Sequence, residues 1–175
     1  MSHKYQRGEF ELPSCTTIID DCTNMSFGLK KWAAAEVVRW IKENTSYCAT
    51  MNGDGFFYVE PEDLEKAEKA YETTGKTALD VGSEVHDAIE KYLTLKMQDK
   101  TPENWKFEFK SDQGVSAFDA FLKWQRDHAL KPIALEQTVY GDFWGGKLDF
   151  LGYFDGKLFV IDWKSSKSFY PEMRY

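Results

Sequence analysis

The feature that most constrains the fold is a pair of segments rich in β-branched and aromatic residues, Lys147 to Phe154 and Lys157 to Lys164, separated only by Asp155-Gly156. Asp-Gly is a strong signal for a two-residue turn, so the segments are predicted to pair as an antiparallel hairpin. Counting back from that turn places Asp149 directly opposite Asp162, in a non-hydrogen-bonded pair with Cα atoms about 4.5 Å apart. Because like charges opposite each other destabilise a sheet, we expect a cation between them.

The residue types around this pair indicate a divalent metal site. Asp149 and Asp162 supply carboxylate oxygens, the hard ligands that Mg²⁺ and Mn²⁺ prefer. Glu136 is a possible additional acid, because a four-residue turn after Tyr140 would place it beside Asp149. His86 lies on a regular helical face near the expected core, and an imidazole among carboxylates would shift the preference toward Mn²⁺.

Such a metal predicts hydrolysis of a phosphate ester. A bound divalent cation polarises a phosphoryl oxygen and lowers the pKa of a bound water, which generates a nucleophile at neutral pH. Lys164, two residues after Asp162, is expected to orient that water and to offset the charge that develops on the phosphate.

The alternative interpretation is a surface ladder of alternating charges, made of Lys147, Asp149, Asp162 and Lys164. Against it, apolar residues continue the same face of the hairpin, so we expect that face to be core and the charges to lie at its edge; these residues are Leu151, Tyr153, Leu158 and Val160. For His86 and Glu136, purely structural roles stay open as alternatives.

The rest of the chain predicts an α+β fold, with N-terminal helices packed on a small, mainly antiparallel sheet. Apolar periodicity and capping residues indicate helices from Ser26 to about Asn44, Pro61 to about Thr73, Thr77 to Gln98 and Val115 to Leu130. A further strand is expected from Ile133 to Tyr140. The inward-facing residues of three of these helices are predicted to be Leu29, Ala33, Val37, Trp40, Ile41, Val85, Ile89, Tyr92, Leu93, Val115, Phe118, Phe121, Leu122 and Gln125. We expect one domain, 1–175, mainly helical over 1–130 and carrying the sheet and metal site over 131–175.

Composition narrows the function classes. A formal charge of −7 is unusual for a nucleic-acid binder, but the residues from Gly145 onward carry five basic and four acidic side chains, a net +1 that leaves −8 for the rest. A cation on Asp149 and Asp162 would make this corner clearly positive. Three cysteines without a Cys-x-x-Cys spacing argue against a disulfide framework, a zinc finger and an iron–sulfur cluster, which needs four ligands. The absence of a long apolar run and the polar N-terminus predict no membrane partner and a cytoplasmic protein.

Three motifs in order, Gly82-x-x-x-His86, Gly145-Gly146-Lys147-Leu148-Asp149 and Asp162-x-Lys164, resemble the RecB-like, Cas4-like branch of the PD-(D/E)XK nuclease superfamily. The match covers most of the chain from Leu12 onward, and Leu12-Pro13-Ser14-Cys15-Thr16-Thr17-Ile18 is similar to the opening of many phage-encoded members. By this resemblance the metal ligands are His86, Asp149 and Asp162, and Lys164 is catalytic.

The resemblance implies a restriction-endonuclease-like core and a Mg²⁺- or Mn²⁺-dependent deoxyribonuclease, an exonuclease of phage or bacterial DNA recombination and repair. The cysteines of the iron–sulfur members are missing, so the cluster-free subgroup fits. The branch usually continues into a helix bearing Gln-x-x-x-Tyr, whereas this sequence ends at Tyr175, which predicts a C-terminal truncation.

Contacts to DNA are expected from residues near these motifs. Ser165, Ser166 and Lys167 are candidates to contact backbone phosphate, and Trp144 or Trp163 to stack on a base, with ordinary packing as the alternative. Two rival functions stay open: a non-catalytic module that binds nucleic acid or a partner on the same fold, and a metal-dependent hydrolase of a small phosphoester.

Overall fold

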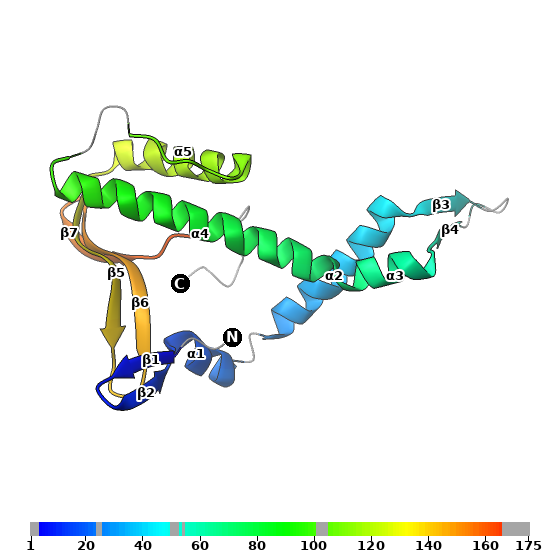
Figure 1. Ribbon diagram of the computed structural model, residues 1–175, viewed down its shortest axis with the longest axis horizontal. Coiled ribbons are helices and arrows are strands. Elements are labelled where there is room, and N and C mark those ends of the chain that lie inside the picture. Colours follow the sequence, from blue (N-terminus) through cyan, green and yellow to red (C-terminus); the bar gives the residue numbers. More distant parts are fainter. Residues whose placement is uncertain (1–3, 24–25, 50–52, 54, 101–104, 166–175) are drawn as a thin grey trace. The chain divides into compact units, whose positions relative to one another are not determined.

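The structure is a computed structural model that describes residues 4–23, 26–49, 53, 55–100 and 105–165 (Figure 1). Its elements are β1 (Lys4–Arg7), β2 (Phe10–Pro13), α1 (Cys15–Thr23), α2 (Ser26–Asn44), β3 (Ser46–Ala49), β4 (Gly55–Tyr58), α3 (Pro61–Glu68), α4 (Ala70–Met97), α5 (Asp112–Asp127), β5 (Leu130–Tyr140), β6 (Gly145–Phe154) and β7 (Lys157–Ile161). Helices and small antiparallel sheets together confirm the α+β class.

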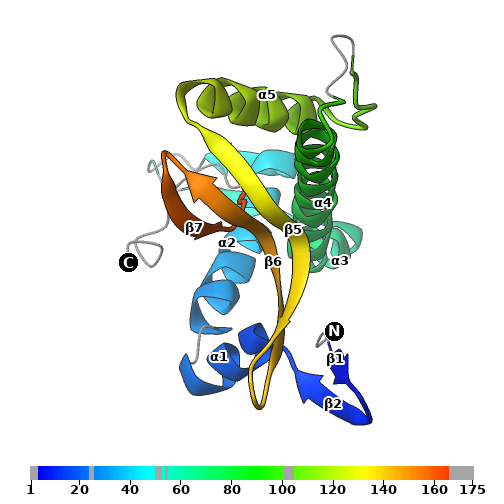
Figure 2. The same cartoon turned by 90° about the vertical axis from the view of Figure 1, so that its left-hand side faces the viewer.

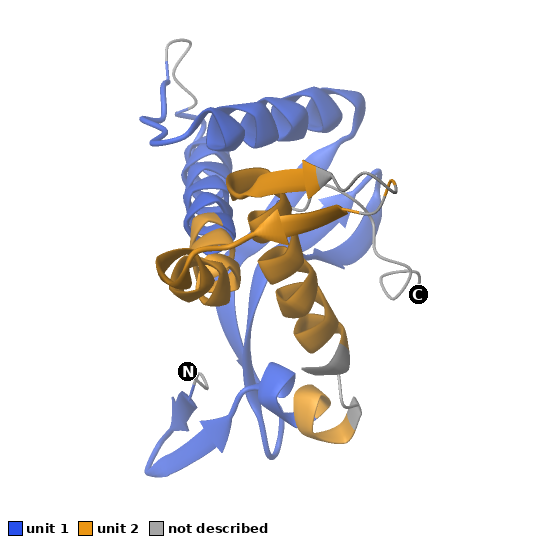
Figure 3. Cartoon of the chain, turned by 90° about the vertical axis from the view of Figure 1, so that its right-hand side faces the viewer, with its two compact units in different colours: residues 1–18, 78–175 blue, residues 19–77 orange. Residues whose placement is uncertain are grey.

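The chain divides into two compact units, one of residues 1–18 and 78–175 and one of residues 19–77 (Figure 3). All the predicted metal ligands belong to the first unit. The prediction of one domain stays a prediction, because a compact unit of a chain need not fold by itself. Among the helices of the described residues, none has the length and apolar character that a membrane span requires.

The sheet of the first unit has the predicted hairpin. Strands β5, β6 and β7 pair in that order, all antiparallel, and Phe154 pairs with Lys157 across the turn. Asp155 and Gly156 have φ of 47° and 82°, the positive values that a type I′ turn requires at both central residues. The register is as predicted over the length of β7, but this strand ends at Ile161 and not at Lys164, so the predicted pair of Asp149 with Asp162 is not formed. Asp162 and Lys164 consequently follow the last paired residue of the strand.

The second turn of the sheet also follows the prediction. Tyr140 pairs with Gly145 across a four-residue turn, and β5 begins at Leu130, three residues before the predicted Ile133. Further along the pair, the register shifts by one residue between Pro132 and Ala134. A bulge at this place is consistent with Pro132, which has no N–H to donate to the ladder.

The hydrophobic core of the first unit lies between α4, α5 and β6 (Figure 2). Its buried members are Val81, Val85, Ala88, Ile89, Leu93, Phe118, Phe121 and Phe150. The N-terminus of α5 is capped by Ser111, whose Oγ accepts a hydrogen bond from Gly114 N at 3.0 Å. The inward stripe predicted for α4 is confirmed at Val85, Ile89 and Leu93, whereas Val115 of α5 is 42% exposed and that prediction was wrong.

The face of the hairpin that was predicted to be core is the exposed one. Tyr153, Leu158 and Val160 are 43%, 60% and 62% exposed, whereas Phe150, which has the opposite parity in β6, is fully buried. Both faces of β6 and β7 carry apolar side chains, so the alternation of apolar and polar residues does not indicate which face is buried. The aromatic rings of α5 decide which face is buried. Phe118 and Phe121 belong to the same buried cluster as Phe150, and Trp124 stacks on Phe154, which lies on the Phe150 face.

The second unit contains α2 with the predicted bounds and a shorter α3. The helix from Pro61 ends at Glu68, and α4 then begins at Ala70, earlier than the predicted Thr77. Within α2 the predicted inward Leu29 is 64% exposed, so that assignment was wrong. The hairpins β1–β2 and β3–β4 were not predicted. The helix expected at Pro171 lies outside the described residues.

Candidate metal centre

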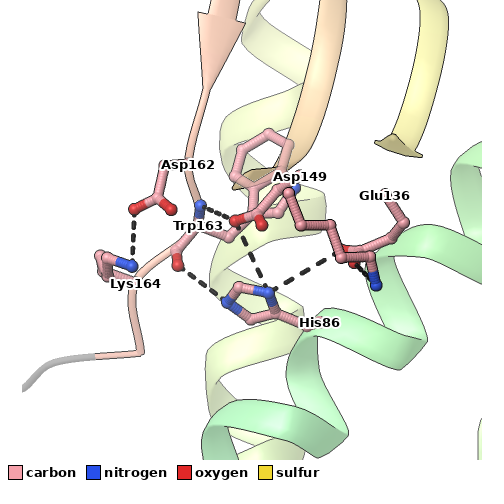
Figure 4. A network of polar contacts seen from close by, with 7 residues as sticks. His86, Glu136, Asp149, Asp162, Trp163 and Lys164 are labelled. Carbon is pink, nitrogen blue, oxygen red and sulfur yellow. Dashed lines mark hydrogen bonds and ion pairs between the residues drawn. The ribbon is translucent and has the colours of Figure 1, made fainter. Parts of the chain in front are cut away.

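Three separate elements bring an imidazole and two carboxylates together. His86 comes from α4, Glu136 from β5 and Asp149 from β6, and one ligand atom of each lies within 4.8 Å of the others (Figure 4). His86 Nδ1 is 3.6 Å from Asp149 Oδ2 and 4.0 Å from Glu136 Oε1. The structure thus places the helical histidine, the β6 aspartate and the additional acid next to one another.

The tautomer of His86 follows from its other ring nitrogen. Nε2 lies 2.8 Å from the carbonyl oxygen of Trp163, and a carbonyl oxygen only accepts, so Nε2 carries the hydrogen and donates it. In the neutral ring, Nδ1 then presents its lone pair to Asp149 and Glu136. Metal-bound histidines almost always donate their second N–H in this manner, to a carbonyl or a carboxylate. A lone pair facing two carboxylates is repulsive until a cation lies between them.

The backbone of Trp163 forms hydrogen bonds with two of the three candidate ligands, His86 and Asp149. Its N–H donates to Asp149 Oδ2 at 2.7 Å while its carbonyl oxygen accepts from His86 (Figure 4). The indole ring packs against Phe121, Trp124 and Phe150, with ring centroids 5.4, 5.8 and 6.0 Å apart. These contacts favour core packing over base stacking for the Trp163 side chain. They also hold in place the peptide groups that orient the site.

Strand pairing is interrupted at Asp149. In the described strands β5 and β7 the register contains no partner for Asp149, although Gln137 pairs with Leu148 and Phe150 pairs with Ile161 on either side of it. Glu136, which would face Asp149, has φ of 49°, a left-handed conformation that costs a non-glycine residue about 1–2 kcal/mol. Strained backbone of this kind concentrates at functional sites.

The pKa of the Asp149 carboxyl is raised above its ordinary value. Burial is the main cause that raises the pKa of this carboxyl, and the charges of Asp162 and Glu136 raise it further. The N–H of Trp163 acts in the opposite direction, as does the charge of His86 when its ring is protonated, but neither outweighs burial. An imidazole nitrogen and two carboxylates, close together and poorly hydrated, form a donor set that fits Mn²⁺ or Mg²⁺.

Asp162 lies beside this group but is not one of its three members. Its Oδ2 is 2.7 Å from the Nζ of Lys164, and both side chains are more than half exposed, at 59% and 58%. Asp149, by contrast, has a side chain that is only 11% exposed. The surface ladder of alternating charges is therefore not what the side chains form, because Asp149 is largely covered.

Lys147 engages the additional acid. Its Nζ is 2.5 Å from Glu136 Oε2, and this hydrogen bond is the main cause that raises the pKa of the lysine. The charges of Glu136, Glu90 and Asp149 raise that pKa as well. No motif of the sequence predicted a role for Lys147 at the site, although the register of β5 and β6 places it diagonal to Glu136, within reach of a long side chain.

An open cavity of about 450 Å³ leads to the site and is lined by His86, Glu136, Lys147, Lys164 and Ser165, among others. A methyl group at Gly82 would lie 3.3 Å from Ser165 Oγ, so this glycine lets the segment after Trp163 pass close to α4. That contact gives the glycine of the Gly82-x-x-x-His86 motif a packing reason.

Five residues were predicted to contact DNA, and two of them, Ser166 and Lys167, lie outside the described residues. Trp144 is 37% exposed in the β5–β6 turn, where its ring covers Gly141 and Gly146. Of the predicted contact residues, the structure therefore brings Ser165 and the backbone of Trp163 to the site.

Comparisons of this chain with protein-family models, with curated proteins and with solved structures found no match.

Proposed function

We propose that this chain is a metal-dependent deoxyribonuclease that hydrolyses DNA phosphodiester bonds, with Mg²⁺ or Mn²⁺ held by His86, Glu136 and Asp149. The observation that carries the proposal is the orientation of His86, whose Nε2 is bound to the Trp163 carbonyl while Nδ1 faces two carboxylates. The motifs that resemble the PD-(D/E)XK nucleases place the same histidine and aspartate among the metal ligands.

Each residue of the site has a role in this proposal. A divalent cation bound there would supply Lewis acidity and a water of lowered pKa. Trp163 keeps the imidazole and the Asp149 carboxylate in place through its backbone. Asp162 supplies a further carboxylate on the exposed side, and the ammonium of Lys164 offsets charge on the phosphate that is attacked.

DNA as the substrate is supported by the charge and openness of the site. Two lysines, Lys147 and Lys164, line the cavity together with the acids, and the segment from Gly145 onward carries a net positive charge within an acidic chain. The family resemblance extends the proposal to an exonuclease of DNA recombination or repair, acting in the cytoplasm of a bacterial or phage-infected cell.

The decisive experiment is a cleavage assay on labelled linear and circular DNA, single- and double-stranded, with Mg²⁺, Mn²⁺ or EDTA. We expect cleavage with either metal, none with EDTA and none from Asp149→Asn. Lys164→Met should cleave much more slowly, while Lys131→Met, which changes an exposed lysine of the same sheet, should cleave normally. Cleavage that persists in EDTA or in Asp149→Asn would contradict the proposal.

A second candidate function is a non-catalytic DNA-binding module, and one observation favours it: Asp162 is paired with Lys164 and lies outside the three-ligand group. Such a module would bind DNA equally well in EDTA and in Mn²⁺ and would cleave no substrate.

A further inference from the structure

Lys147 occupies the position of an internal counter-cation at the candidate metal centre. Its ammonium contacts Glu136 Oε2 at 2.5 Å, while the other oxygen of the same carboxylate, Oε1, lies 4.0 Å from His86 Nδ1. Asp149 and Glu90 add negative charge around the ammonium. One carboxylate is therefore shared between a lysine on one side and the candidate ligand group on the other.

The two partners of Glu136 differ in how firmly they are held. The Glu136 side chain is 16% exposed, whereas that of Lys147 is 51% exposed and sits on a flexible four-carbon stem. Because about half of the Lys147 side chain is exposed, water can solvate its ammonium when it leaves the carboxylate. A divalent cation attracts the carboxylate more strongly than the ammonium does, because its charge is doubled.

Building on the proposed function, we infer that Lys147 and the divalent cation compete for Glu136, and that cation binding releases Lys147 to hold a phosphate of the bound nucleic acid strand. Lys147 and Lys164 both line the open cavity beside His86, so the freed ammonium lies where a phosphate would enter. An ammonium engaged by a carboxylate is a poor phosphate ligand, and a free one is a good one. Lys147 is then a positioning residue whose availability depends on the cation.

Binding of Mn²⁺, measured by calorimetry at neutral pH, tests the competition without reference to activity. Lys147→Met removes the charge but keeps the length of the side chain, so we expect about tenfold tighter Mn²⁺ binding than in the unchanged protein. The matched control Lys131→Met should bind Mn²⁺ like the unchanged protein. In a Glu136→Gln background, Lys147→Met should no longer tighten binding, because the contested carboxylate is gone.

Release toward phosphate is tested by fluorescence anisotropy of a labelled single-stranded oligonucleotide, with Ca²⁺ as an oxygen-seeking cation that takes the place of Mn²⁺. With EDTA, Lys147→Met and the unchanged protein should bind the oligonucleotide equally. With Ca²⁺, we expect Lys147→Met to bind about fivefold more weakly, since one charge-assisted contact is lost.

Several outcomes would overturn the inference. Mn²⁺ binding that Lys147→Met leaves unchanged or weakens, or an oligonucleotide defect of equal size with and without Ca²⁺, excludes the exchange while leaving the metal centre intact. Mn²⁺ binding that is absent, or that His86→Ala does not affect, refutes the proposed function itself and the exchange with it.

Discussion

The imidazole of His86 and the peptide of Trp163 are joined by a 2.8 Å hydrogen bond from Nε2–H to the carbonyl oxygen. The bond links the middle of α4 to the segment that follows β7, 77 positions later in the chain. It leaves Nδ1 as the nitrogen that faces Asp149 and Glu136. The ligand geometry of the candidate metal centre therefore depends on packing between a helix and a strand end.

Replacing His86 with alanine should remove most of the Mn²⁺ affinity. Changing a residue that only hydrogen-bonds to a metal ligand typically lowers metal affinity by roughly 10–100-fold. We expect a larger loss of affinity here, because the substitution removes a proposed ligand itself. Titration calorimetry checks this. His128→Ala is the matched control, since this histidine follows α5 and its ring pairs at 2.9 Å with Asp155 of the β6–β7 turn. Equal losses in both variants would contradict the assignment of Nδ1 as a ligand.

The pH dependence of stability should carry a contribution from Asp149. Burial raises the pKa of this carboxyl above its ordinary 3.8, so the folded chain holds the proton more tightly than the unfolded chain. The contribution is full below the ordinary value and is lost as pH rises through the raised pKa. Asp149→Asn should abolish this loss, measured by urea denaturation in EDTA from about pH 4 to about pH 8.

The contribution of Asp155 to stability should depend on pH in the opposite direction, so this residue serves as the comparison for Asp149. Hydrogen bonds from Ala129 N and from the His128 side chain lower the pKa of the Asp155 carboxyl. Its contribution is present above the ordinary pKa and is lost as pH falls. Asp155→Asn should therefore flatten the acidic side of the stability curve, and the same trend in both variants would show that burial does not dominate at Asp149.

Lysine 164 should be needed for cleavage but not for metal binding. Its ammonium contacts Asp162 and none of the three ligands of the group. Lys164→Met should lower the cleavage rate by about 100-fold, the loss typical when one group that stabilises transition-state charge is removed. Calorimetry should give an Mn²⁺ affinity close to that of the unchanged protein. A large drop in that affinity would place Lys164 in the support of the ligands instead.

Substitutions on the two faces of the β6–β7 hairpin should differ in their effect on the free energy of unfolding. Phe150 is fully buried, so Phe150→Ala should lower the free energy of unfolding by about 3–5 kcal/mol. Val160 of β7 is 62% exposed, and Val160→Ala should change it by less than about 0.5 kcal/mol. Urea denaturation of the two variants measures the difference. A larger loss of stability from Val160→Ala than from Phe150→Ala would indicate that the core lies on the face that the sequence predicted.

The sequence alone predicted the hairpin, both registers of the sheet and the proximity of His86, Glu136 and Asp149, whereas Asp162, also predicted as a ligand, lies outside this group. These features depend on local chemistry: Asp155-Gly156 accepts the positive φ of its turn, and the length of each turn sets the pairing of the strands it joins. The placement of Glu136 near Asp149 and the inward stripe of α4 follow from the same short-range rules.

Tertiary packing decided what those rules leave open. Apolar residues occur on both faces of β6 and β7, so the aromatic rings of α5, and not the alternation, selected the Phe150 face as core. Packing likewise turned the peptide of Trp163, which follows the end of β7, toward both His86 and Asp149. The physical reason is that contacts between residues distant in the chain depend on how helices and sheet cover each other, which no local pattern encodes.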